Sequence, residues 1–296
     1  MLTPSWVDRD AWPYAPREVT VHGSRLHYVD EGSGPLVVLV HGTPTWAFEW
    51  RHVIAALRDG HRVVALDHLG FGLSERPREA GYRPEDHAAR FRAFIDAVCP
   101  AGPMTLVVHD FGGPIALDWA LDHPERLAQL VVVNSWMWSF ADDPAMRLKA
   151  RIAGSGFGRW LFRRFNASQR IIMPSAYADR RRLTAAIHAQ YLAVFPDAHS
   201  RELVLFALAR SLLASSPFFD GLWQRRAGVA QVDTHLIWGM RDSAFGPNLL
   251  ARWQRGLPHA RTTTLAAAGH WPHEETPGEF VAALRGVVAR PGVPGP

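Results

Sequence analysis

The chain of 296 residues contains 32 basic and 28 acidic side chains, has a formal net charge of +4, and is 48% hydrophobic. These values are typical of globular proteins with a sizeable core, and no run of eighteen consecutive apolar residues occurs, which excludes a predicted membrane span. Cys99, the single cysteine, excludes an intramolecular disulfide and a cysteine-ligated zinc site.

The first twelve residues lack the basic stretch and the apolar run of a signal peptide, so we expect a cytoplasmic protein. Strand and helix patterns then alternate up to residue 135, beginning with a hairpin of residues 18–21 and 25–29. The strands expected next are 35–40, 62–66, 104–108 and 127–133, and the expected helices are 46–57, 84–98 and 111–121. This alternation predicts an α/β fold, a mostly parallel sheet flanked by helices.

The alternation stops between residues 136 and 217, where helical segments follow one another without a buried strand. The basic runs Arg163–Arg164 and Arg180–Arg182 lie there, and we interpret them as solvated helix faces, so a nucleic acid is not an expected partner. Because no long apolar run occurs, a membrane is not an expected partner either. The pattern resumes with strands 235–238 and 261–265 and helices 248–256 and 278–288, and residues 291–296 are expected to form a frayed tail. We therefore predict a core of residues 1–135 and 218–296, with a helical domain, residues 136–217, inserted after the sixth strand.

A tight turn between a buried strand and a helix carries the candidate nucleophile. In TLVVHDFGGPIAL the strand ends at Asp110, and Gly112 and Gly113 begin the helix. A strained nucleophile turn requires such small residues, although Val108 stands where the stricter pattern has glycine. Aspartate is also a common helix N-cap. The position at the carboxyl end of a strand, where open α/β sheets bind ligands, favours the nucleophile.

The loop HGTP follows an earlier buried strand and is expected to face the same crevice. We predict that the backbone N–H groups of Thr43 and Phe111 form an oxyanion hole there, because two such donors can stabilise a negatively charged oxygen. The bond between Thr43 and Pro44 is a candidate for the cis form.

Two later strands end in residues that complete a predicted triad. Asp242 follows the strand after the insertion and His270 follows the last strand, so the chain order is nucleophile, acid, base, as in α/β-hydrolases. His273 is the alternative base, but its position beside two glutamates suggests a surface cap. The other place for the acid, the end of strand 127–133, holds Asn134 and Ser135 instead.

Five motifs are in register with a known family: HGTPTW, DHLGFGLSERP, VVHDFGGPIAL, WGMRDSAFGP and AGHWPHEE. On these motifs, nearly the whole chain resembles the haloalkane dehalogenase and epoxide hydrolase branch of the α/β-hydrolases, and haloalkane dehalogenases most closely. The resemblance implies a hydrolase with an aspartate nucleophile, and it implies that the insertion is a cap over the site. The expected reactants are a small apolar organic substrate and water, with no cofactor and no metal.

Two positions depart from the haloalkane dehalogenase pattern. Those enzymes usually carry tryptophan after the nucleophile and an asparagine, or a second tryptophan in the cap, whose N–H groups hold the halide; here Phe111 and Thr43 stand at those places. Because a phenylalanine ring has no N–H donor, another group must contact the leaving group. The weak candidates are three tryptophans, each of which also suits core packing, and two tyrosines of the insertion: Trp46, Trp136, Trp138, Tyr177 and Tyr191.

The predicted reaction has two steps. Asp110 displaces a halide and forms an alkyl-enzyme ester, and His270, oriented by Asp242, activates the water that hydrolyses this ester to an alcohol. Three alternatives stay open. An epoxide hydrolase would use the paired tyrosines as its acid, a lyase that decarboxylates β-lactones would use the same aspartate, and a non-catalytic binder of small molecules would need none of the triad.

Overall fold

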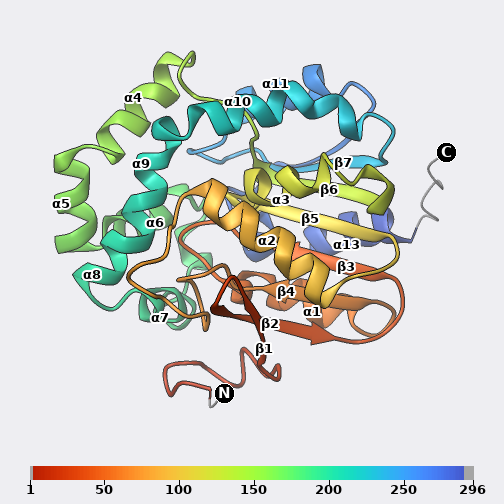
Figure 1. Cartoon of the computed structure of the whole chain (residues 1–296), viewed down its shortest axis with the longest axis horizontal. Coiled ribbons are helices and arrows are strands. Elements are labelled where there is room, and N and C mark those ends of the chain that lie inside the picture. Colours follow the sequence, from red (N-terminus) through yellow and green to blue (C-terminus); the bar gives the residue numbers. More distant parts are fainter. Residues whose placement is uncertain (1–2, 290–296) are drawn as a thin grey trace.

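The computed structural model describes residues 3–289 and has one eight-stranded sheet at its centre (Figure 1). The predicted frayed tail, residues 291–296, lies outside the described residues. The strand order is β1-β2-β4-β3-β5-β6-β7-β8. The strands are β1 (Arg17–Val21), β2 (Ser24–Glu31), β3 (Leu36–Val40), β4 (Arg62–Leu66), β5 (Met104–Asp110), β6 (Leu127–Ser135), β7 (Thr234–Gly239) and β8 (Arg261–Leu265).

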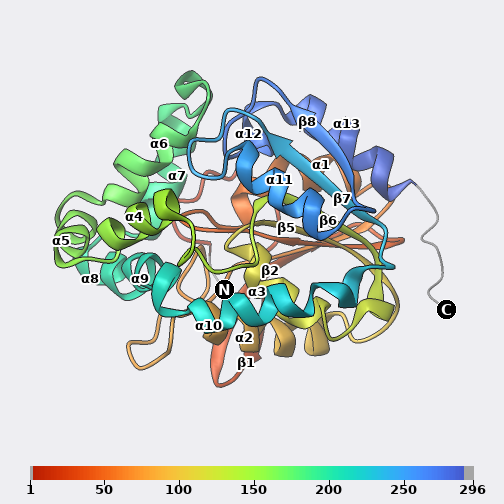
Figure 2. The same ribbon diagram turned by 90° about the horizontal axis from the view of Figure 1, so that it is seen from above.

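The sheet confirms the predicted α/β fold. Strands β1 and β2 form the expected antiparallel hairpin, β2 pairs antiparallel with β4, and all other pairs are parallel. Helices α1 (Arg51–Leu57) and α13 (Pro277–Val288) cover one face, and α2 (Pro84–Val98) and α3 (Gly112–Ala120) cover the other (Figure 2). Because both faces are covered, the central strands are apolar throughout rather than alternating.

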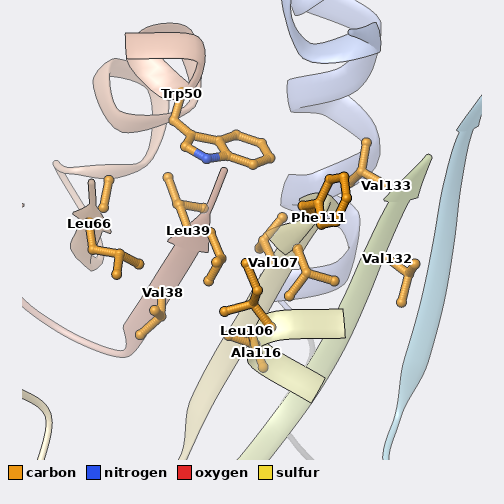
Figure 3. Close-up of a cluster of buried hydrophobic side chains, with 14 of the residues drawn as sticks. Val38, Leu39, Trp50, Leu66, Leu106, Val107, Phe111, Ala116, Val132 and Val133 are labelled. Atoms are coloured by element: carbon orange, nitrogen blue, oxygen red, sulfur yellow. The ribbon is translucent and has the colours of Figure 1, made fainter. Parts of the chain in front are cut away.

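The apolar centre of the sheet leads directly to the edge where the predicted site residues lie. Figure 3 shows Leu39 of β3 beside Val107 of β5, and Val133 of β6 further along the sheet next to Phe111. All three strand residues are fully buried. The residues that follow these strands are therefore held on a rigid, close-packed support.

The described segment between β6 and β7 contains helices and turns but no strand, as expected for the insertion after the sixth strand. Most of its helices lie beyond one end of the sheet (Figure 1). The predicted domain boundary at residue 217 falls inside α10. The helices are α4 (Pro144–Ala153), α5 (Gly156–Phe165), α6 (Met173–Ala176), α7 (Ala185–Val194), α8 (Ala198–Ser200), α9 (Ala207–Ala214) and α10 (Ser216–Gln224).

The chain after β7 adds α11 (Pro247–Gly256) and α12 (Pro272–Glu275) before α13. Within residues 3–289, no single helix has both the length and the apolar composition needed to span a bilayer. One bent pair, Ala198–Ala214 with Ser216–Val229, meets both criteria, by length and composition only.

Candidate active site

Asp110 occupies a strained turn at the end of β5. Its φ angle is +48°, a left-handed conformation that residues other than glycine rarely adopt. A Cβ atom at Gly112 would lie 2.5 Å from the carbonyl oxygen of Val40, and one at Gly113 would lie 1.8 Å from Ser135 Oγ. Both positions therefore require glycine. Ser135 Oγ also donates a hydrogen bond to the Asp110 carbonyl oxygen at 2.6 Å, which holds the turn against β6.

The structure brings Asp110 together with three other predicted residues, Thr43, His270 and Asp242. The Thr43 N–H donates to Oδ1 at 2.8 Å, and His270 Nε2 lies 3.4 Å from Oδ2. On the far side of the imidazole, Nδ1 is 2.6 Å from Asp242 Oδ2. These side chains come from the ends of β5, β7 and β8, which meet at one edge because the strands are parallel.

Asn134 holds Asp242 in place, a role that sequence reasoning missed. Its side-chain amide donates to Asp242 Oδ2 at 2.9 Å and accepts from the Gly239 N–H at 2.8 Å. The Ala244 N–H donates to the other carboxylate oxygen at 2.7 Å. An asparagine at the end of β6, where an acid was sought, was the available signal, because neighbouring parallel strands bring their ends together.

The two carboxylates keep a proton on His270. Burial lowers the pKa of this imidazole, but its interactions with Asp242 and Asp110 outweigh burial and raise the pKa to about 10. Burial raises the pKa of Asp242, and the nearby His270 together with hydrogen bonds brings it below its ordinary value. His270 therefore carries a positive charge between the two aspartates at neutral pH.

A second buried aspartate holds the segment that follows the HGTP loop. Asp67, at the start of the DHLGFG motif, accepts hydrogen bonds from the N–H groups of Ala47 at 2.8 Å and Leu73 at 2.9 Å. The Thr43–Pro44 bond in this loop is cis, as expected. The Thr43 hydroxyl is buried and has no hydrogen-bond partner within the described residues. It is therefore a free donor in the residue whose backbone N–H contacts the Asp110 carboxylate.

Behind His270, three buried side chains form a polar cluster that the sequence did not reveal. His109 donates from Nε2 to the backbone carbonyl of His270 at 2.9 Å, and its Nδ1 lies 3.1 Å from Glu49 Oε1. His273 is fully buried and stacks on Trp50, so the prediction that it is a surface cap was wrong. Burial holds the pKa of His273 well below its ordinary value.

These three residues are also the group best placed to hold a metal ion among residues 3–289. The ligand atoms of Glu49, His109 and His273 lie within 4.8 Å of one another. The Glu49–His109 hydrogen bond occupies two of the three ligand atoms, and His109 uses its other nitrogen for the His270 carbonyl. This arrangement fits a network that positions the His270 backbone better than it fits a metal centre.

A cavity of about 550 Å³ opens above Asp110 and is mostly apolar. Its floor includes Asp110, Phe111, His270 and Trp271, and most of its wall residues come from the insertion. The wall residues from the insertion are Met146, Lys149, Ala150, Ile152, Ala153, Gly158, Leu161, Phe162, Ala167, Ser168, Ile171, Ile172, Ser175, Ala176, Leu205, Ala209 and Leu212. The cavity thus fits a small apolar molecule placed against the aspartate.

The three tryptophans expected near a leaving group do not line this cavity. Each packs against other aromatic rings instead: Trp46 against Trp12 and Phe48, Trp136 against Phe111 and Phe140, and Trp138 against Trp223 and Trp253. The tryptophan that does line it is Trp271, whose indole N–H is buried without a partner in the described residues.

The two tyrosines of the insertion also point elsewhere. The hydroxyls of Tyr177 and Tyr191 both donate to the carboxylate of Glu274, which Arg51 also contacts. Burial, followed by Glu274, raises the pKa of each tyrosine well above its ordinary value. Neither residue lines the cavity. Their hydroxyls are therefore used to seat the insertion on the core.

A mostly parallel sheet whose strained acid turn faces a histidine and a second acid defines the class of α/β-hydrolases. Residues 35–277 match the family described as alpha/beta hydrolase fold. Haloalkane dehalogenase 2 of Mycobacterium bovis is 35% identical over 279 residues, which are 94% of this chain and 96% of that protein. The cis-3-alkyl-4-alkyloxetan-2-one decarboxylase of Shewanella oneidensis is 30% identical, over 92% of this chain and 88% of that protein.

A solved structure gives the same result. The crystal structure of haloalkane dehalogenase DbeA from Bradyrhizobium elkani superposes with a TM-score of 0.82 at 26% identity, covering 93% of this chain and 97% of that one. The chain belongs to the α/β-hydrolase family, in its haloalkane dehalogenase branch, and is an enzyme of the hydrolase type. The resemblance inferred from the motifs is thereby confirmed.

Proposed function

We propose that the protein hydrolyses a carbon–halogen bond with Asp110 as the nucleophile. The observation that carries this proposal is the Asp110 carboxylate on its strained turn, with one oxygen held by the Thr43 N–H and the other facing His270. Asp110 attacks the carbon that bears the halogen, a C–O bond forms, and the halide leaves with the bonding electrons. The product of this step is an alkyl ester of Asp110.

The second step becomes possible because the first step removes the negative charge of Asp110. Esterification makes Asp110 neutral, so one of the two carboxylates that keep the proton on His270 is lost and the pKa of His270 falls. The imidazole can then release its proton to solvent and take one from a water molecule, while Asp242 orients it. That water attacks the ester carbonyl, and the N–H groups of Thr43 and Phe111 stabilise the oxyanion. The bond between the carbonyl carbon and the alkyl oxygen then breaks, His270 gives its proton to the leaving alcohol, and the Asp110 carboxylate is restored.

The leaving halide requires hydrogen-bond donors, and the cavity offers two that are otherwise unused. The Thr43 hydroxyl and the Trp271 indole N–H are buried, lie in residues that line the cavity, and have no partner within residues 3–289. We assign them to the leaving group in place of the five residues expected earlier. Tyr177 and Tyr191 are engaged with Glu274, so an epoxide hydrolase is not proposed.

Trapping the ester tests this mechanism. The His270→Gln variant, incubated with a bromoalkane, is expected to release one bromide per protein and to gain the mass of the alkyl group on the peptide that contains Asp110. The matched control is His188→Gln, because His188 lies on α7 and does not line the cavity; it should turn over the substrate as the unaltered protein does. A His270→Gln protein that releases bromide but carries no alkyl group would contradict the aspartate mechanism.

A second candidate is the decarboxylation of a β-lactone, and Phe111 is the observation that favours it. Its ring provides no donor for a halide, and the Shewanella relative is named for an oxetan-2-one, which is a β-lactone. Asp110 would attack the saturated ring carbon that is bonded to the ring oxygen. The bond between that carbon and the oxygen would break, which leaves a carboxylate on the substrate. Loss of carbon dioxide would then form a carbon–carbon double bond and expel Asp110.

The two reactions differ in their use of water. Hydrolysis of a haloalkane in ¹⁸O-labelled water places the label in Asp110 in the first turnover and in the alcohol in later turnovers, whereas the lactone reaction consumes no water and releases an alkene. Assays with a bromoalkane and with a cis-dialkyl β-lactone, each followed by product and by label, separate the two. Bromide release without lactone turnover supports the first candidate, and alkene formation without bromide release supports the second.

A further inference from the structure

The exposed apolar surface of the molecule is concentrated on one part of the insertion. Large hydrophobic side chains with 45–61% of their surface exposed occur only between residues 148 and 172 within the described chain. They are Leu148, Ile152, Phe157, Trp160, Phe165, Ile171 and Ile172. Helices α4 and α5, which carry most of them, project from the molecule in both views (Figures 1 and 2). We call these seven residues the cap patch.

The aromatic residues of the cap patch form one cluster on α5. The rings of Phe157 and Trp160 stack with centroids 5.9 Å apart, and Trp160 meets Phe165 edge-on at 5.0 Å. The same helix also contributes Leu161 and Phe162 to the cavity. Helix α5 is therefore apolar toward solvent as well as toward the interior. A contiguous exposed patch of this kind marks a binding surface.

The charge around the cap patch is mostly positive. Residues 144–178 contain seven basic side chains and no acidic one. Arg159 and Arg163 are paired with Glu202, which lies on a neighbouring segment. The remaining arginines have no ion-pair partner within residues 3–289; they are Arg147, Arg151, Arg164 and Arg170. Aromatic and aliphatic side chains surrounded by arginine are the composition of helices that lie in the interface of an anionic membrane.

The cap patch is continuous with the mouth of the cavity. Ile152, Ile171 and Ile172 are half-exposed and also line the cavity above Asp110. Lys149 stands at the same place and donates to the carbonyl oxygen of Ser243 at 3.0 Å. If an apolar surface is bound to the cap patch, an apolar molecule can therefore pass from that surface into the cavity without crossing bulk water.

We propose that the cap patch docks the protein on an anionic lipid bilayer and that apolar substrates enter the cavity from the acyl-chain layer. The aromatic cluster of α5 would lie at the depth of the lipid headgroups, and the unpaired arginines would contact lipid phosphates. Pairing of two copies through the cap patch is disfavoured, because it would bring two sets of arginines together. This proposal reverses the sequence-based expectation that no membrane is a partner, and it does not depend on which reaction Asp110 catalyses.

Vesicle flotation with the full chain tests the proposal. We expect binding to vesicles of phosphatidylcholine and phosphatidylglycerol mixed three to one, little binding to phosphatidylcholine alone, and release at high salt. In the charge-reversed variant Arg164→Glu/Arg170→Glu the partition coefficient should fall by at least about twentyfold, from about fivefold per positive charge removed. The variant Phe157→Ala/Trp160→Ala should also bind less, because it removes apolar area from the interface.

The matched control is Arg17→Glu/Arg255→Glu. Both arginines are exposed, unpaired within the described residues and outside the cap patch, and the change lowers the net charge by four, from +4 to 0, as in the test variant. Binding that this control preserves supports the proposal. Equal loss in both variants would show attraction by net charge alone and would overturn it. So would absence of binding to either vesicle, or a stable oligomer that Phe157→Ala/Trp160→Ala converts to monomer, which would assign the cap patch to a second copy.

Discussion

Helices α3 and α5 are nearly equal in length, but the protein uses them in opposite ways. In α3, which follows the turn that carries Asp110, all residues but Asp118 are buried. In α5, which covers the cavity, Phe157, Trp160 and Phe165 are exposed to solvent. A packed helix fixes atoms to within tenths of an ångström, as a reacting carboxylate requires, whereas an exposed one determines what can approach. Substitutions near α3 should therefore change the rate and the stability, and those on α5 should change access.

The largest effect is expected from substitution of Asp110, the proposed nucleophile at the end of β5. Asp110→Asn removes the charge of the nucleophile with little change in shape, so kcat/KM for a haloalkane should fall by about ten-thousandfold or more. The control is Asp118→Asn, on the outer side of α3, which pairs with Arg225 and lies outside the cavity. Comparable activity of Asp110→Asn and the unaltered protein in initial-rate measurements would rule out the aspartate as nucleophile.

A smaller loss of activity is expected from substitution of Asn134, which contacts Asp242 and not the substrate cavity. Asn134→Ala removes the amide that donates to Asp242, and a hydrogen bond to a charged group is worth about 1.5–3 kcal/mol. We therefore expect kcat, which includes ester hydrolysis, to fall about ten- to hundredfold. The rate of ester hydrolysis should fall more than that of ester formation, because only the second step requires His270 as a base. Rapid-quench measurement of both steps checks this; an equal loss in both would indicate a general disturbance of the site.

The strained turn itself can be tested through stability. A methyl group at Gly113 would collide with Ser135 Oγ, and such overpacking typically costs about 1–3 kcal/mol of unfolding free energy. Gly113→Ala should be destabilised by this amount in urea unfolding. Adding Ser135→Ala should restore part of it, because the colliding oxygen is removed. If the double variant loses more unfolding free energy than the two single variants together, the close approach between residue 113 and Ser135 is not the cause.

The raised pKa of His270 predicts a pH dependence of stability. The pKa of His270 is about 10 in the folded protein against an ordinary value of 6.5, so its ion pairs contribute stability fully below pH 6.5 and lose it as the pH rises through about 10. The difference in unfolding free energy between the unaltered protein and His270→Gln should therefore shrink across this range. Urea unfolding at a series of pH values measures it, and a difference that grows with pH would contradict the raised pKa.

The positions of the predicted triad follow from local pattern alone. Asp110, Asp242 and His270 each come directly after an apolar strand, and the carboxyl ends of parallel strands meet at one edge, so their proximity needs no knowledge of side-chain packing. The two glycines after Phe111 identify the turn for the same reason, because their small size is visible in the sequence. The family resemblance rests on these same segments.

The sequence by itself determined the α/β fold, the helical insertion and the three acid and base groups at the sheet edge, because each depends on short-range pattern and on the strand order that such patterns impose. Only the tertiary structure decided which aromatic residues face the cavity: Trp271 does, while Tyr177 and Tyr191 turn to Glu274, about a hundred residues away. It also decided the burial of His273 and the exposure of α5. Periodicity identifies an apolar face. Whether that face is buried depends on contacts with segments that are distant in the sequence.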